Sequence, residues 1–166
     1  MKVVSNASPL ITLARIGHLD SLHKLYDVVH ISTEVYNEVV IAGAGLPGAA
    51  AVSKADWIRV SPVHDVEGLT KLLAAKTGLG AGEISAVFLA KELAADLTLM
   101  DEWKGRRLAV GEGLAVAGCI GILEEIYRRK EIADLRQVYQ ELLRQNIRVD
   151  LRTLQGSLRQ FGLAPF

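Results

Sequence analysis

Several residue types and patterns that mark particular protein classes are scarce or absent in this sequence of 166 residues. Cys119 is its single cysteine, which excludes an internal disulfide, and no Cys or His spacing around it fits a zinc site; we expect a buried apolar residue. Aromatic residues make up 5% of the chain, too few for a sheet of exposed base-stacking rings. No run approaches the roughly 18 apolar residues of a membrane span, and Ser5 and Asn6 come too early for a signal peptide. The sequence thus predicts a cytoplasmic protein with no membrane partner.

Charge of one sign is also lacking. Lys and Arg total 19, as do Asp and Glu, so the net charge is zero and binding of nucleic acid by overall positive charge is excluded. Half of the residues are hydrophobic and 23% are charged, which is typical of a globular chain with a packed core. The length corresponds to one domain of about 150 residues.

Apolar β-type runs alternate with helical patterns along most of the chain. Ser8 followed by Pro9 predicts the N-cap and first residue of a helix that ends near Gly17. Ser32 or Thr33 can cap another helix. The expected strands are 2–5, 28–31, 57–61, 97–100 and 114–117; the main expected helices are 19–25, 33–41, 66–76, one from residue 83, 101–109, 122–129, 135–145 and 153–160.

Strands that alternate with helices predict an α/β fold with a parallel sheet, because each parallel connection requires a crossover and a helix is the favoured one. Ligands of such sheets bind beyond the carboxyl ends of the strands, near a topological switch point. Asn6 follows the first expected strand and Asp101 follows the fourth.

Four oxygen-bearing side chains share this expected location: Asn6, Glu38, Glu83 and Asp101. Clusters of this kind bind Mg²⁺ or Mn²⁺, which can activate a water and stabilise the oxygens of a phosphodiester under attack. Each residue alone also has a structural explanation, as a turn former, a solvated helix residue, a partner of the helix dipole and an N-cap, respectively. The nearby Ser8 is a candidate for contact with the substrate, and a capping role is the alternative.

Four segments occur in an order that resembles the PIN-like domains, in particular a subgroup akin to the VapC-type toxins of prokaryotic toxin–antitoxin pairs. The resemblance covers roughly residues 3–150. The segments are Val4 to Ile11, Val35 to Val39, Gly78 to Ala86 and Leu99 to Ala109.

The resemblance implies a three-layer α/β/α sandwich with a small, mostly parallel five-stranded sheet and extra C-terminal helices. It implies a nuclease domain over 1–150, with 151–166 as a helical extension packed on it. The implied activity is that of an endoribonuclease dependent on Mg²⁺ or Mn²⁺, commonly dimeric and neutralised by a small antitoxin protein. Glu38, Glu83 and Asp101 fall on the acidic positions of the family, and Glu102 is an additional candidate ligand.

The sequence departs from the family pattern at Asn6, where the usual residue is Asp. An amide supplies an oxygen but no charge. Substitution of residues that only hydrogen-bond to the metal ligands already costs about 10- to 100-fold in affinity or activity, so loss of a charged ligand should cost at least as much. The alternative is therefore a catalytically degenerate module that binds RNA or a protein partner without cleaving.

Three basic residues, Lys104, Arg106 and Arg107, follow Asp101 and are candidates for contact with the RNA backbone; a solvated helix face is the alternative. The glycines of 78–82 follow a helix and lack the third glycine of a dinucleotide fingerprint, and the four histidines lack zinc-site spacing. For a homodimer interface we considered the apolar residues of the last helices, which also fit a core: Ile122, Leu123, Ile126, Leu135, Val138 and Leu142.

Overall fold

Each of the five apolar runs forms a short strand in the computed structural model, which describes residues 1–166. The strands lie within about two residues of the expected positions because the runs are bounded by turn residues or by the next helix cap. They are β1 (Val3–Ser5), β2 (Val29–Ser32), β3 (Ile58–Ser61), β4 (Leu97–Leu99) and β5 (Val116–Ala117).

All pairings in the sheet are parallel, and the strand order is β3-β2-β1-β4-β5. The chain runs outward from β1 to β3 and then returns to the other side of β1 to form β4. The order therefore reverses between β1 and β4, where Ser5 pairs with Leu99 and the amide of Asn6 donates to the Leu99 carbonyl at 2.9 Å. This is the topological switch point at which ligands of such sheets bind.

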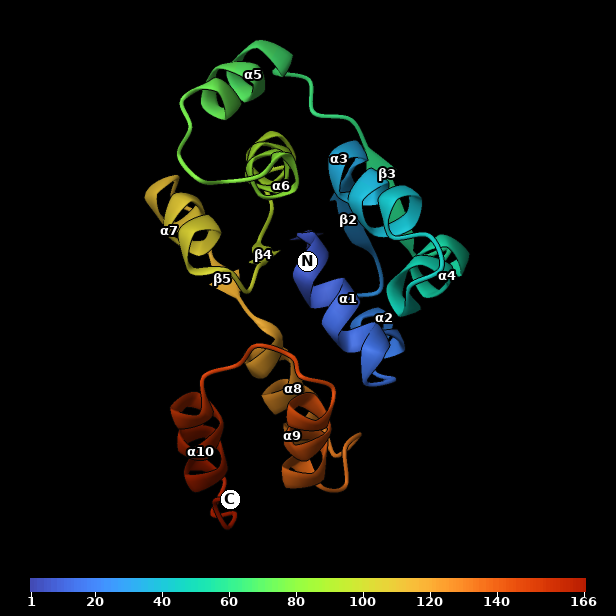
Figure 1. The fold of residues 1–166 in the computed structure, drawn as a ribbon, viewed down its shortest axis with the longest axis vertical. Coiled ribbons are helices and arrows are strands. Elements are labelled where there is room, and N and C mark those ends of the chain that lie inside the picture. The colour runs from blue at the N-terminus through green and yellow to red at the C-terminus, as the bar shows by residue number, and fades with distance from the viewer.

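Helical segments make up most of the remaining chain (Figure 1). They are α1 (Ala7–Arg15), α2 (Asp20–Tyr26), α3 (Thr33–Tyr36), the π-helical η1 (Asn37–Ala42), α4 (Pro47–Lys54), α5 (Val66–Ala74), α6 (Ala81–Glu92), α7 (Trp103–Gly111), α8 (Cys119–Arg128), α9 (Leu135–Arg144) and α10 (Leu151–Gln160).

The helices cover both faces of the sheet, which confirms the three-layer α/β/α architecture. Helix α6 packs on β1, β2 and β4 and contacts α5 and α7, whereas α1 packs against α4 and α8 and α2 packs against β2. In Figure 1, α5 and α6 lie at one end of the molecule and α8, α9 and α10 at the other. The sheet is fully parallel, where the sequence indicated a mostly parallel one.

One connected cluster of 34 buried apolar side chains extends from Val3 in β1 to Leu158 in α10, so the last helices share their core with the sheet. The hydroxyls of Tyr139 and Ser157 also join α9 to α10 through a buried hydrogen bond of 2.7 Å. The expected dimer face is wrong, because α8 and α9 turn it inward: only Val138 is partly exposed, and Ile122, Leu123, Ile126, Leu135 and Leu142 are buried.

Two expected helix starts are also wrong. Helix α1 has Asn6, not Ser8, at its N-cap, so Pro9 is its third residue, where a missing N–H is tolerated because the first-turn N–H groups have no intrahelical partner. Helix α7 starts at Trp103, with Glu102 at its N-cap, which leaves Asp101 outside the helix. Both shifts place polar side chains in the connection between strand and helix.

A chain of buried hydroxyls joins the segment that carries Glu38 to the helix that carries Glu83. Ser32 Oγ caps α3 by accepting from the Val35 amide at 3.0 Å and lies 2.7 Å from Ser85 Oγ. Ser85 donates to the Gly82 carbonyl at 3.0 Å, so the Ser32 hydroxyl is the donor to Ser85. These bonds fix the distance between α3 and α6.

We predict that Ser32→Ala lowers the free energy of unfolding by about 1–2 kcal/mol, because it removes an N-cap and leaves the buried Ser85 with one partner fewer. Urea unfolding followed by circular dichroism measures this change. Ser53→Ala is the matched control, since Ser53 is exposed and bonds only to the Ala50 carbonyl. Equal stability of the two variants would contradict the role given to Ser32.

Candidate active site

An acidic pocket of about 470 Å³ opens at the switch point. Its carboxylates come from the α3–η1 segment, from the first turn of α6 and from the N-cap of α7, which the sheet brings together. No basic side chain lines it. The lining residues are Asn6, Ser8, Glu34, Asn37, Glu38, Ala42, Gly80, Ala81, Gly82, Glu83 and Glu102.

Asn6 forms the floor of the acidic pocket and is only 2% exposed. Its Nδ2 donates to Glu102 Oε2 at 3.3 Å, but its Oδ1 is buried and has no hydrogen-bond partner. A buried acceptor without a donor costs roughly 1–3 kcal/mol, so this oxygen is suited to a cation or a donor that enters the pocket.

Glu102 is held by the residues that begin α1. Both the Asn6 amide and the Ser8 hydroxyl donate to its carboxylate. Ser8 therefore acts on Glu102, which corrects the capping role expected from the sequence. The arrangement places a negative charge next to Asn6, at the position where the sequence itself lacks one.

Glu38 lies in η1, a π-helical segment of a kind often found at functional sites. Its Oε2 approaches Gly82 so closely that a Cβ there would lie 2.3 Å from it and 3.6 Å from Asn6 Oδ1. Any side chain at position 82 would therefore force the Glu38 carboxylate to move. Glu83 Oε2 accepts from the Gly80 amide at 2.6 Å, which caps α6 and leaves Oε1 without a hydrogen bond.

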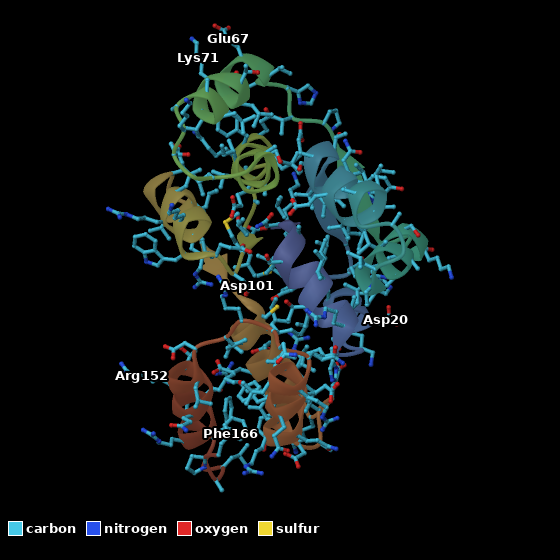
Figure 2. All side chains as sticks on the ribbon, viewed as in Figure 1. Asp20, Glu67, Lys71, Asp101, Arg152 and Phe166 are labelled. Carbon is cyan, nitrogen blue, oxygen red and sulfur yellow. The ribbon has the colours of Figure 1, made fainter.

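Asp101 lies outside the lining of the acidic pocket, at the junction between β4 and the C-terminal helices (Figure 2). Its Oδ1 accepts from the Cys119 amide at the start of α8 at 2.7 Å. A Cβ on Gly118 would lie 2.9 Å from this oxygen. The structure therefore leaves Asp101 out of the pocket that Asn6, Glu38 and Glu83 share, which corrects the single cluster expected from the sequence. Asp101 directly precedes Glu102 in the chain, and its bond to Cys119 fixes it at the end of β4.

Two of the acidic groups resist ionisation. Desolvation raises the pKa of Glu38 above its ordinary value, and the negative charges of Glu83 and Glu102 raise it further. Burial raises the pKa of Asp101, although the hydrogen bond from Cys119 opposes this effect. The buried Cys119 has its pKa raised well above the ordinary value by burial and by Asp101, so it remains a thiol, as expected for a core residue.

The acidic pocket fits a hard divalent cation that keeps part of its water shell. It is lined by four carboxylates and by no basic side chain. Two of its buried oxygens, Asn6 Oδ1 and Glu34 Oε2, have no hydrogen-bond partner. The structure contains no group of three or more Asp, Glu, His or Cys side chains that could hold an ion by themselves. Mg²⁺ usually binds through one or two carboxylates, waters and substrate phosphates, so a smaller protein ligand set is sufficient.

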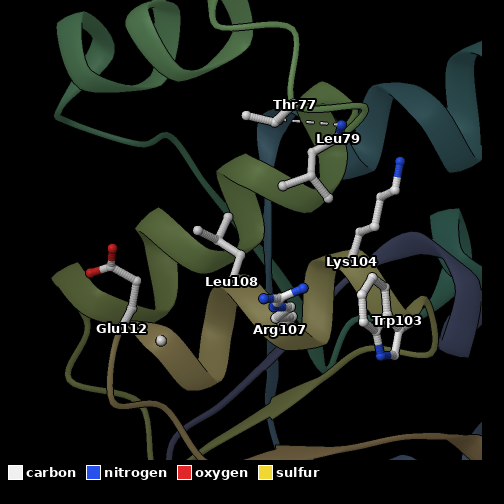
Figure 3. A pocket seen from close by; sticks show the side chains of 8 residues that line it. Thr77, Leu79, Trp103, Lys104, Arg107, Leu108 and Glu112 are labelled. Atoms are coloured by element: carbon white, nitrogen blue, oxygen red, sulfur yellow. Dashed lines mark hydrogen bonds between the residues drawn. The ribbon is translucent and has the colours of Figure 1, made fainter.

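The three basic residues that the sequence indicated for RNA contact lie at two different places in the structure. Arg106 Nη1 donates to the Met100 carbonyl at 3.0 Å and turns toward Asp101 and Gly118. Lys104 and Arg107 instead line a separate pocket on α7 (Figure 3).

Two participants of the site, Glu34 and Gly82, are not among the residues predicted from the sequence. Glu34 lies one helical turn before Glu38, and this spacing was the available signal that the two carboxylates share a face. The close approach of Gly82 to Glu38 had no signal in the sequence, since it depends on how α6 meets η1.

Comparison with known proteins places this arrangement in a class of fold that carries nucleases. A family model described as a PIN domain matches residues 2–163. The chain therefore belongs to the PIN domain family, as its four segments predicted, and has a nuclease-type fold. PIN domains are generally nucleases that use divalent metals, and the fold suggests RNA binding. A search of curated proteins found no match. None of the helices is both long and apolar enough to cross a membrane.

We predict that Glu38→Gln raises the melting temperature at pH 7 in EDTA. The folded state raises the pKa of Glu38, so its ionisation destabilises the protein as the pH rises above the ordinary value of 4.5. The gain should shrink as the pH falls toward 4.5. Thermal unfolding between pH 4.5 and 7 tests this, with Glu67→Gln on the exposed face of α5 as control. A lower melting temperature of Glu38→Gln at pH 7 would contradict repulsion within the acidic pocket.

Proposed function

We propose that this protein is a metal-dependent endoribonuclease and the toxin of a prokaryotic toxin–antitoxin pair. One observation carries the nuclease part: the acidic pocket at the switch point combines four carboxylates with unpartnered buried oxygens and contains no basic side chain. The family membership supports the same activity. The toxin role, a small antitoxin as partner, a homodimer and a cytoplasmic location follow from the resemblance to VapC-type toxins.

Asn6, Glu38, Glu83 and Glu102 would hold Mg²⁺ or Mn²⁺. Asp101, the residue before Glu102, lies outside the lining of the acidic pocket and stays a proposed site residue. The bound ion supplies an activated water and positive charge for the phosphate oxygens. Glu38 Oε2 and Asn6 Oδ1 face the same glycine, so one ligand can contact both. Glu102 supplies the charge that Asn6 lacks, and Ser8 and Asn6 hold it in place.

A non-cleaving module is the second candidate, and Asn6 is the observation in its favour. Its amide nitrogen donates to Glu102, whereas an Asp at position 6 would repel that carboxylate. The metal-free pocket is therefore more stable with Asn6 than it would be with Asp. Such a protein would bind RNA or a protein partner through the same fold. Activity measured on wild type and Asn6→Asp separates the two candidates.

We predict that purified wild type cleaves a mixed structured and single-stranded RNA with Mn²⁺ or Mg²⁺ and not with EDTA. Glu38→Gln and Asp101→Asn should lower the rate at least 10- to 100-fold, because each removes a charge at the site. Asn6→Asp should raise the rate at limiting metal. Glu38→Gln and Asp101→Asn, purified in the same way, control for contaminating nuclease, and Glu67→Gln controls for a substitution away from the site.

Absence of RNA cleavage by wild type, together with cleavage by Asn6→Asp, would establish a degenerate nuclease. If neither wild type nor Asn6→Asp cleaves any of several different RNAs, the nuclease proposal is overturned. Melting temperature with Mn²⁺ adds a readout of metal binding that does not require cleavage, because a ligand that binds only the folded state stabilises it.

The toxin role predicts that expression of wild type stops the growth of a bacterial host, whereas equal expression of Glu38→Gln does not. The physical reason is the loss of host RNA to cleavage, which the variant lacks. Growth curves with matched protein levels measure the effect. Normal growth of cells that contain an active wild-type enzyme would count against a toxin.

A further inference from the structure

A second pocket, of about 430 Å³, adjoins the acidic pocket and is formed mainly by α7 and the segment before α6 (Figure 3). We call it the Trp103 pocket. Its lining residues are Thr77, Leu79, Trp103, Lys104, Arg107, Leu108, Gly111 and Glu112.

Two peptide links connect the two pockets. Leu79 lines the Trp103 pocket and the next residue, Gly80, lines the acidic pocket. Glu102 lines the acidic pocket, and the next residue, Trp103, lines the other. Neighbouring Cα atoms are 3.8 Å apart, so the two pockets have walls that meet at two places, within reach of one chain molecule.

Trp103 is held in a defined position although it is 67% exposed. The guanidinium of Arg107, one helical turn later, lies over the indole at 5.2 Å from the ring centre. Such a contact restrains the ring, and the exposure leaves indole surface available for a second planar group. The side chains of Leu79 and Leu108 add an apolar wall (Figure 3).

The Trp103 pocket also has positive charge that no other residue neutralises. Neither Lys104 nor Arg107 forms an ion pair, whereas Glu112 is paired with Lys91 at 2.6 Å. Lys104 reaches toward Gly78, where a Cβ would lie 2.6 Å from its Nζ. Two cations without an ion-pair partner and a planar aromatic surface are complementary to phosphates and a base.

We infer that the Trp103 pocket binds single-stranded RNA next to the cleavage site, with one base stacked on Trp103 and phosphates contacted by Lys104 and Arg107. This inference rests on the proposed function, since it supplies the subsite that adjoins the acidic pocket. The strand is single because a paired base is already stacked within a duplex. Every base has a planar face, so this subsite selects unpaired RNA and tolerates different sequences.

Binding in EDTA tests the inference without cleavage. A labelled oligouridylate of eight residues is titrated with protein, and fluorescence anisotropy gives the dissociation constant. Trp103→Ala should weaken binding about tenfold, within the range known for the loss of one stacked base. Trp103→Phe should keep most of the affinity. Val110→Ala is the matched control, because Val110 is 63% exposed on the same helix but outside the pocket.

Direct contact with the indole is measured in Trp57→Phe. The chain has two tryptophans, and Trp57 is 8% exposed and stacked on His23, so its replacement leaves Trp103 as the single reporter. The oligonucleotide should quench this fluorescence. Lys104→Gln and Arg107→Gln should each weaken binding and reduce its salt dependence, because each loses a phosphate contact. An oligodeoxyuridylate should bind similarly, and a duplex RNA of equal length should not quench.

Inorganic polyphosphate separates stacking from charge. Trp103→Ala should bind it as wild type does, and equal weakening for polyphosphate and oligouridylate would overturn the stacking role. Unchanged binding of oligouridylate by Trp103→Ala would overturn the inference even if wild type cleaves RNA. Stacking on Trp103 in a protein that never cleaves would support the inference and count against the proposed function.

Discussion

The parallel pairing of β1 with β4 is the constraint on which the site depends. These strands are more than ninety residues apart in the chain. Their pairing reverses the order in which strands are added to the sheet, from one side of β1 to the other. A strand end at a switch point leaves room for a ligand, because the connections on either side turn away from each other. Asn6 and Asp101 stand at this point, and the α3–η1 segment and α6 close over it with Glu38 and Glu83.

The acidic pocket is a place where stability is given up for function. Desolvation, together with the charges of Glu83 and Glu102, raises the pKa of Glu38, and Asn6 Oδ1 is buried without a partner. Unfavourable features of this kind cluster at functional sites and persist because the surrounding structure holds them. Here the Ser32–Ser85 bond and the capping bond of Glu83 to Gly80 supply that support. The site is thereby prepared for a cation before one arrives.

Asn6 and Glu102 divide a role between them. A side chain with only an amide at the end of β1 weakens a metal site, but here the amide orients Glu102, and Ser8 donates to the same carboxylate. The negative charge is thus carried by Glu102, which contacts Asn6, and not by residue 6 itself. The acidic pocket keeps its negative charge in this way. Trp103 is the first residue of α7 and Glu102 occupies its N-cap position, so the N-terminus of α7 contributes to both the acidic pocket and the Trp103 pocket.

The sequence by itself determined the five strands and the α/β class, because apolar runs and helix patterns are local and the PIN segments are specific in combination. It also nominated Glu38, Glu83 and Glu102, which line the acidic pocket, but not Glu34. It offered Ser32 or Thr33 as a helix cap, and the structure shows that Ser32 is the cap, since its Oγ accepts from the Val35 amide. Tertiary structure decided the rest. The start of α1 at Ala7, the bond of Asp101 to Cys119 and the burial of the supposed dimer face depend on contacts between segments distant in the chain, for which periodicity carries no signal.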